Sequence, residues 1–241
     1  MRQNKFTLVE LLVVICIASL LMGVVLPAFS RMVTGSAVDR LASNLKVRLA
    51  RAQSEAVASR KDVALILPSG NAPSFGTNLS QAEWINARLG GSRMCYVTTA
   101  NYVGRFSAWV PDETWSLPER GASLIYAGND PANIVATGSA QPFGALSASQ
   151  SVSPSVSSSI AATTSHDGEK PLKDITDGTN TISNAAVIFS SKGNVRSLRD
   201  VYFVVAESTI NGNSLLFPGG GAYNFKALKI NRLTGNVEHF R

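Results

Sequence analysis

Apolar and polar positions divide the chain into three parts, of which the first is an apolar run. Residues 11–30 contain no charged side chain, and a helix of about 20 apolar residues is long enough to cross a bilayer. The run therefore predicts a membrane-spanning helix. A cleavable signal peptide is the alternative, but its apolar region has only about 7–15 residues and ends in small residues, whereas this run ends in Leu26-Pro27-Ala28-Phe29.

The second part, residues 36–60, has the spacing of an amphipathic helix. Its apolar side chains recur every three or four residues, which places them on one face; they are Val38, Leu41, Leu45, Leu49, Ala52 and Ala56. We expect the membrane helix to continue into this segment and to pack its apolar face on a sheet. Arg40, Lys46 and Arg51 are expected to form a solvated face.

The third part consists of short apolar runs separated by turn residues, which is typical of strands. Expected strands are 63–67, 94–98, 105–110, 123–126, 185–189, 195–198, 201–206, 225–230 and 236–240. Turns at 190–194 and 232–236 place Gly193 and Gly235 where a positive φ is needed. Residues 80–83 form a capping box for a short helix. The serine-rich stretch 137–165 is expected to be a mobile surface loop.

Basic residues at the N-terminus predict the orientation of the apolar run. Arg2 and Lys5 precede it and the first five residues contain no acid, so the positive-inside rule retains the N-terminus in the cytoplasm. Because no second run of this length occurs, we expect a single-pass membrane protein. The C-terminal part then lies outside the cytoplasm.

Composition excludes several classes of protein. Of 241 residues, 45% are hydrophobic and 16% are charged, with a net charge of +6, which excludes wholesale disorder and indicates only a mild basic bias. Cys16 and Cys95 suit no disulfide framework, and we expect both to be small buried hydrophobic residues. No motif for a nucleophile, a metal or a phosphate is found. We therefore expect no catalytic residue, no metal and no cofactor, and no enzyme.

One acid lies at the start of the apolar run. Glu10 would cost about 2.5–3.5 kcal/mol at the centre of a membrane helix, so a simple anchor has no use for it. Two interpretations are open from position alone. Glu10 either lies at the headgroup boundary, where it costs little, or has a functional partner within the membrane.

The residues around Glu10 resemble a known signal. Phe6-Thr7-Leu8-Val9-Glu10, followed by Leu11-Leu12-Val13-Val14-Ile15 and preceded by a short basic leader, is similar to the class III signal of type IV pilins and type II secretion pseudopilins. The resemblance implies cleavage by a prepilin peptidase between Lys5 and Phe6 and N-methylation of Phe6. It also implies that Glu10 pairs with the terminal ammonium of a neighbouring subunit and sets the register of assembly.

Two positions leave alternatives within this resemblance. The family usually has Gly before the cleavage point and this chain has Lys5, so a processed subunit and an uncleaved anchor are both open. Pro27 lacks a backbone N–H and is expected to bend or break the helix. The other interpretation is that Pro27 marks the exit from the membrane.

The amphipathic segment and the last strands resemble minor subunits of this family in particular. Leu49-Ala50-Arg51-Ala52-Gln53-Ser54-Glu55-Ala56-Val57, the strand after Asp62 and the two glycine turns are similar to H-type pseudopilins and FimT-like minor pilins. The implied fold is α+β, with a long N-terminal helix packed on an antiparallel β-sheet head. The implied parts are a leader (1–5), a transmembrane helix (6–30), an amphipathic helix (31–62) and a β-rich head (63–241).

The resemblance implies a non-enzymatic structural subunit. It would assemble through its helix into a type II secretion pseudopilus or a type IV pilus, with other pilins, a prepilin peptidase and an inner-membrane assembly platform as partners. A competence-type minor pilin that binds DNA is the alternative, since a group of cations near the C-terminal strands could form an anion patch. These cations are Arg196, Arg199, Lys226, Lys229 and Arg232. A third alternative is a membrane-tethered enzyme that uses the helix only as an anchor.

Overall fold

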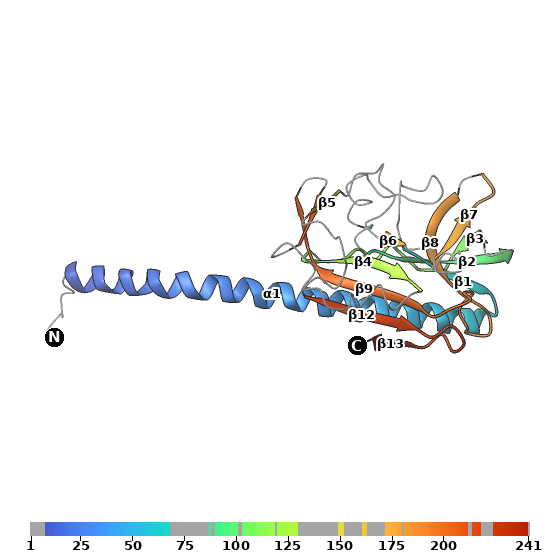
Figure 1. The fold of residues 1–241 in the computed structure, drawn as a ribbon, viewed down its shortest axis with the longest axis horizontal. Helices are drawn as coiled ribbons and strands as arrows, with labels where there is room; N and C mark the ends of the chain where they lie inside the picture. Colours follow the sequence, from blue (N-terminus) through green and yellow to red (C-terminus); the bar gives the residue numbers. More distant parts are fainter. Residues whose placement is uncertain are drawn as a thin grey trace.

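The computed structural model describes residues 8–67, 87, 90–100, 103–118, 120–129, 149–151, 161–162, 172–179, 181–211, 214–217 and 224–240. Its first element is a single helix, α1 (Leu8–Ser59), of 52 residues. At 1.5 Å per residue this helix is about 78 Å long. Its second part runs along the β-rich head, and its first part projects away from the head (Figure 1).

The strands follow α1 in chain order and none is long. They are β1 (Asp62–Ile66), β2 (Arg93–Ala100), β3 (Val103–Trp109), β4 (Ala122–Gly128), β5 (Ser149–Ser151), β6 (Ala161–Ala162), β7 (Lys173–Thr176), β8 (Thr181–Phe189), β9 (Val201–Glu207), β10 (Thr209–Asn211), β11 (Ser214–Leu216), β12 (Phe225–Ile230) and β13 (Val237–Phe240). The expectation of an α+β chain is confirmed by this content.

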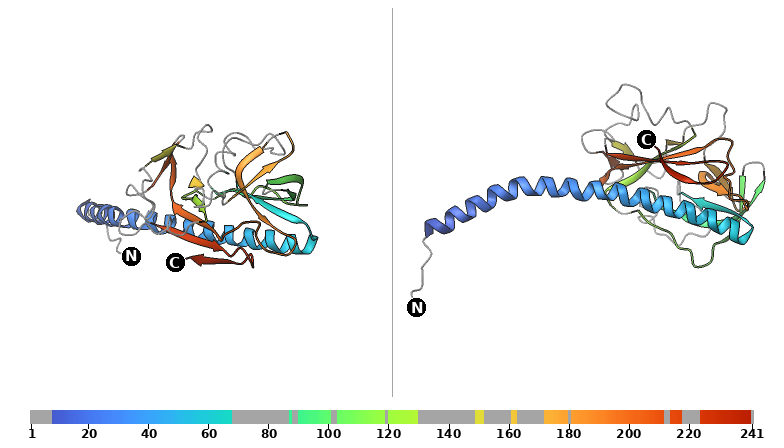
Figure 2. Two further views of the ribbon diagram at one scale, coloured as in Figure 1. Left: turned by 45° about the vertical axis from the view of Figure 1, so that its right-hand side comes forward. Right: turned by 90° about the horizontal axis from the view of Figure 1, so that it is seen from below.

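The described strands form three sheets. One is a closed barrel in the order β1-β2-β3-β7-β8, the second has the order β13-β12-β9-β4-β6, and the third is β10-β11-β5. The pairs β3–β7 and β4–β6 are parallel, and the other pairs are antiparallel. We had expected an antiparallel sheet, so the barrel and the two parallel pairs are a correction. Both glycine turns lie at the end of the head where α1 ends (Figure 2).

The main core lies between α1 and the two larger sheets. In α1 the buried stripe includes Val38, Leu41, Leu45 and Leu49, as its spacing predicted. The helix contacts β1, β4, β8, β9, β12 and β13. Each fully buried leucine contributes about 1.5–3 kcal/mol relative to an exposed one. The amphipathic part of α1 is therefore the central element of the head's core.

Strands β1 and β9 are buried on both faces, which explains why the head has more than one layer. In β9, Val201, Phe203 and Val205 face the core with α1, while Tyr202 and Val204 belong to a second cluster on the opposite face. In β1, Val63 and Leu65 face α1, whereas Ala64 and Ile66 lie inside the barrel. Successive side chains of a strand point to opposite faces. A continuous apolar strand therefore needs cover on both sides.

Most strand predictions are confirmed and one is wrong. The expected runs coincide with β1, β2, β3, β4, β8, β9, β12 and β13, but no strand forms over 195–198. There Val195 makes a single bridge to Phe189, and the backbone N–H of Arg199 then donates to Ser197 Oγ at 3.4 Å. This local contact favours a bend, because serine hydroxyls compete for nearby backbone groups.

Two further expectations concern the loops. The serine-rich stretch was expected to be a mobile surface loop, yet two short parts of it, Ser149–Ser151 and Ala161–Ala162, are strands that pair with β11 and β4, which corrects that prediction. Backbone pairing does not depend on apolar side chains, so composition gave no signal for these strands. The remainder of 137–165 and the capping box at 80–83 lie outside the described residues.

The two glycine turns meet at one side chain of α1. Gly193 and Gly235 have φ angles of +86° and +69°, as the turn pattern predicted. Gln53 Nε2 donates to Gly193 O at 2.9 Å and to Thr234 O at 2.5 Å, so one amide holds both turns against the helix. A Cβ built on Gly235 would lie 2.2 Å from Gly193 O and 2.5 Å from Gln53 Nε2.

Substitution of Gly235 by alanine should destabilise the head by about 3 kcal/mol. The left-handed backbone costs an L-residue about 1–2 kcal/mol, and the methyl group would also displace the Gln53 amide from carbonyls that it satisfies. Chemical denaturation of the full chain measures the change. Gly178→Ala is the matched control, because Gly178 also has a positive φ (+100°) but only Arg105 Nη2 nearby, at 3.7 Å. Equal losses in the two variants would contradict the close approach inferred at Gly235.

Candidate functional site

The projecting part of α1 is the most unusual surface of the described chain. Eleven large apolar side chains between Leu8 and Met22 are 48–80% exposed. They cover all sides of the helix, because this segment is almost continuously apolar. A helix that is hydrophobic all round belongs inside a membrane or among other helices. This segment of α1 therefore needs a cover that the head does not supply.

Glu10 is the single charged residue of residues 8–23. It lies in the first turn of α1, where the positive end of the helix dipole stabilises a carboxylate by about 0.3–1 kcal/mol. This placement puts an acid near the free end of an apolar rod, far from the head. The other members of the predicted processing site, Lys5 and Phe6, lie outside the described residues.

The helix continues through Pro27. The prediction of a helix break at Pro27 is not met, since α1 is helical from Leu8 to Ser59. Proline fixes φ near −65°, which suits a helix, and removes only one intrahelical hydrogen bond directly. A gentle curve of the projecting half is visible in Figure 2. The rod and the head-bound helix are thus one element.

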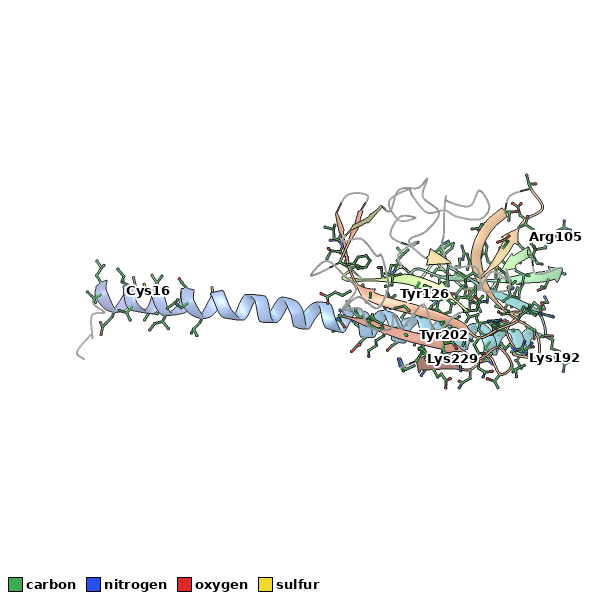
Figure 3. All side chains as sticks on the ribbon, viewed as in Figure 1. Cys16, Arg105, Tyr126, Lys192, Tyr202 and Lys229 are labelled. Carbon is green, nitrogen blue, oxygen red and sulfur yellow. The ribbon has the colours of Figure 1, made fainter. Side chains whose placement is uncertain are left out.

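Two findings bear on the membrane and cysteine predictions. Among the residues that the structure describes, no helix is both long enough and apolar enough to cross a membrane. Cys16 is exposed on the projecting part of α1, away from the head (Figure 3). The prediction that Cys16 is buried is therefore wrong for the single chain. Cys95 is buried as expected, and burial raises the pKa of its thiol to about 12.

A buried carboxylate fastens α1 to the head. The side chain of Glu113 is 2% exposed and pairs with Arg48 and, at 3.3 Å, with Arg51 Nη1. Arg48 Nη2 also donates to Ser92 O at 3.0 Å. Arg93 Nε donates to Glu113 O at 3.1 Å, and the guanidinium of Arg93 lies 3.9 Å from the centre of the Trp109 ring.

Charge compensation explains why this cluster is tolerated. Burial lowers the pKa of Arg48, while the Glu113 carboxylate opposes that effect. The attraction between the half-buried Arg48 guanidinium and the bonded Glu113 carboxylate offsets part of the cost of removing both charges from water. Either charge alone would bear its desolvation cost without this compensation. The cluster thereby fixes the rotation of α1 about its own axis relative to the head.

Further polar contacts lie along the same part of α1. Tyr96 Oη donates to Glu55 Oε1 at 2.6 Å, which raises the pKa of Tyr96. Near the other end of the head, Lys226 Nζ lies 2.6 Å from Asp39 Oδ1. From Asp39 to Glu55 the helix is therefore held at several points over about 24 Å.

Sequence analysis missed most of this attachment. Arg51 was expected only to be solvated, and Arg48, Glu113 and Gln53 were given no role. Glu113 follows Pro111 and Asp112 in a turn, and nothing in that pattern names a partner 65 residues earlier in the chain. A clue available in the sequence was the pair of arginines one turn apart beside the apolar stripe.

The five cations of the predicted anion patch do not form one uncompensated surface, because three of them are held in ion pairs at different places on the head. Lys226 pairs with Asp39, Arg196 Nη2 lies 3.2 Å from Asp62 Oδ2, and Lys229 Nζ lies 3.2 Å from Asp200 Oδ2. Asp200 in turn raises the pKa of Lys229. This surface therefore carries mixed charge. Binding of nucleic acid stays a prediction.

The remaining two cations lie beside a depression in the head. Arg199 is exposed, and Arg232 Nη1 donates to Leu198 O at 2.6 Å. Both line an open hollow of about 360 Å³. Within the described residues no group of three or more His, Cys, Asp or Glu side chains is arranged to hold a metal ion.

Comparison with known proteins gives two similar structures. No family model and no curated protein matches the chain. It is similar to two crystal structures of the type IV minor pilin FimU from Pseudomonas aeruginosa strain PAO1. The first has 12% sequence identity and a TM-score of 0.38 over 86% of this chain and 90% of that chain. The second has 11% identity and a TM-score of 0.36 over 84% and 92%.

Loss of the Glu113 carboxylate should loosen the helix from the head. Glu113→Ala is expected to destabilise the chain by about 3–5 kcal/mol, because Arg48 would be left with a buried, unpaired charge. Glu238→Ala is the matched control: this carboxylate is 54% exposed and lies 3.6 Å from Lys229, so its loss should cost at most about 1 kcal/mol. Thermal unfolding of both variants checks the difference. A loss as small as that of the control would show that the cluster does not hold the helix.

Proposed function

We propose that the chain is a pilin-like minor structural subunit that assembles through its N-terminal helix. The observation that carries the proposal is the division of α1 into two parts. From Ala37 to Ala56 its apolar stripe is buried in the head, while from Leu8 to Met22 apolar side chains are exposed on all sides. A purely soluble domain gains nothing from such a projecting rod, whereas a subunit that polymerises inside a bundle of like helices requires it.

The first residues support the same proposal. The order Phe6-Thr7-Leu8-Val9-Glu10 immediately precedes the apolar run, as in the class III signal of type IV pilins and pseudopilins. We propose cleavage by a prepilin peptidase between Lys5 and Phe6, followed by N-methylation of Phe6. Both changes leave a positive charge at the new N-terminus, four residues before Glu10.

Glu10 would then set the register between subunits. In a bundle of apolar helices an unpaired carboxylate is costly, and a neighbouring ammonium group offsets part of that cost. A subunit displaced along the bundle axis would lose this pair while keeping its non-directional apolar contacts. The charge pair therefore supplies the axial specificity that packing of leucine and valine side chains lacks.

The proposed location follows from the same segment. Before assembly the rod would lie in the bacterial inner membrane, with the N-terminus in the cytoplasm and the head outside it. Other pilins or pseudopilins and an inner-membrane assembly platform are the proposed partners. The amphipathic segment and the glycine turns favour a minor subunit of the H-type or FimT-like kind, in a type II secretion pseudopilus or a type IV pilus.

Replacement of Glu10 by alanine should abolish incorporation into a filament while membrane insertion is retained. The reason is that alanine removes the pair with the neighbouring ammonium but makes the rod more apolar. The measurement is the amount of subunit in membrane and sheared-filament fractions of cells that carry the sister subunits. Ser19→Ala is the control, since Ser19 Oγ only donates to Ile15 O at 2.8 Å within the same helix. Normal incorporation of the Glu10→Ala protein would contradict the pairing.

Processing should give a chain that begins at Phe6 with a methylated amino group. Mass spectrometry of the protein from cells with and without a prepilin peptidase measures both changes. The peptidase would have to accept Lys5 at the position before the cleavage point, so Lys5→Gly should be processed at least as completely. A protein that keeps Met1, or one that starts beyond Ser30, would refute the proposed processing.

A further inference from the structure

The open hollow in the head has the composition of a binding site. It lies where β4 ends and β9 begins, next to the turn between β12 and β13. It is lined by Asn129, Leu198, Arg199, Asp200, Tyr202 and Arg232. A volume of about 360 Å³ is within the usual range for small-ligand sites.

Asn129 is the most informative residue of this hollow. It is 3% exposed, and both polar atoms of its side chain, Nδ2 and Oδ1, are buried and have no hydrogen-bond partner among the residues that the structure describes. An unsatisfied buried polar group costs about 1–3 kcal/mol. Native proteins pair most such groups. An amide retained at this cost, beside a depression that admits a ligand, points to a partner that brings one donor and one acceptor.

Two charged residues of the hollow, Arg232 and Asp200, are held in place by contacts within the head. The backbone N–H of Arg232 donates to Asp200 Oδ1 at 2.8 Å, and Arg232 Nη1 donates to Leu198 O at 2.6 Å. Asp200 also pairs with Lys229, so its negative charge is already compensated. The guanidinium groups of Arg199 and Arg232 line the hollow, and guanidinium groups bind carboxylates in a two-pronged geometry.

We propose that this hollow binds an acidic peptide segment, meaning a carboxylate with an adjoining peptide group. Arg199 and Arg232 would bind the carboxylate, and the buried amide of Asn129 would donate to the peptide carbonyl and accept from the peptide N–H. The carboxylate is either an acidic side chain or the end of a chain. The site does not depend on assembly through α1 and goes beyond the proposed structural role.

The surroundings favour a peptide over a nucleic acid. Single-stranded nucleic acid binds to exposed aromatic faces in a continuous positive groove. Here the ring of Tyr202 packs edge-on against Phe240, with 5.0 Å between ring centres, and Asp200 lies among the cations. A phosphate would also leave Asn129 Oδ1 without a donor, whereas a peptide N–H supplies one.

The test uses the full chain in detergent and short synthetic peptides. The probes are acetyl-Gly-Gly-Asp-amide, which has a side-chain carboxylate, and acetyl-Gly-Gly-Gly acid, which has a terminal one. Acetyl-Gly-Gly-Asn-amide is the uncharged control, and inorganic phosphate is the simple anion. Titrations followed by NMR should show binding of at least one acidic peptide with a Kd of about 1 mM or tighter, and binding of the uncharged peptide at least tenfold weaker.

Two variants locate the site and one is a control. Arg199→Gln should weaken acidic-peptide binding about tenfold. Asn129→Leu should also weaken it while raising the melting temperature, because it replaces an unsatisfied buried amide with an apolar group of similar size. Arg105→Gln changes an exposed arginine on the barrel, away from Tyr202 and Lys229 (Figure 3), and should leave binding unchanged.

Four outcomes would overturn the proposal. The first is that neither acidic peptide binds at 10 mM, which is about ten times the expected Kd. The second is that the uncharged peptide binds as tightly as the acidic ones, and the third is that phosphate does. The fourth is that Arg199→Gln binds the acidic peptide with full affinity. A lower melting temperature in Asn129→Leu would assign Asn129 a structural role and remove it from the site. None of these results bears on filament assembly, which the Glu10 variant tests separately.

Discussion

Burial of one stripe of a single helix is the constraint on which the rest of the molecule depends. Leu41, Leu45 and Leu49 of α1 lie in the same core as residues of the barrel and of the five-stranded sheet. Neither sheet could cover its inner face without the helix, since β1 and β9 are apolar on both sides. The head therefore packs its main core around the second half of α1, while two smaller apolar clusters, one inside the barrel and one on the opposite face of β9, form without the helix.

This dependence explains how the polar contacts are used. Apolar packing along a helix is tolerant of sliding and rotation, because its contacts are not directional. Arg48 with Glu113 and Gln53 with the two turns supply directional contacts on different sides of the same segment. They select one rotation and one axial position from those that apolar packing permits. In the proposed function, a force applied to the rod would then reach the head without slippage.

Much of the fold could be predicted from the sequence because it is recorded in local periodicity. The spacing of Val38, Leu41, Leu45 and Leu49 predicts the buried stripe, and the turns at Gly193 and Gly235 were placed by a requirement for positive φ. The barrel could not be predicted, because β7 (Lys173–Thr176) closes it with two charged residues among four. Its pairing partner β3 lies about 70 residues earlier, and no local pattern encodes that pairing.

The candidate sites also divide into those that the sequence reveals and those that only the structure reveals. Glu10 could be found because a charge in an apolar run is visible in the sequence. Glu113 and Asn129 could not, since their importance comes from burial by distant segments.

Among the described strands, every strand of the barrel has a neighbour on both sides, so no unpaired backbone edge is presented there. Between crowded heads, strand addition would thus be confined to the two open sheets, whose outer strands in the described residues are β13 and β6 in one and β10 and β5 in the other.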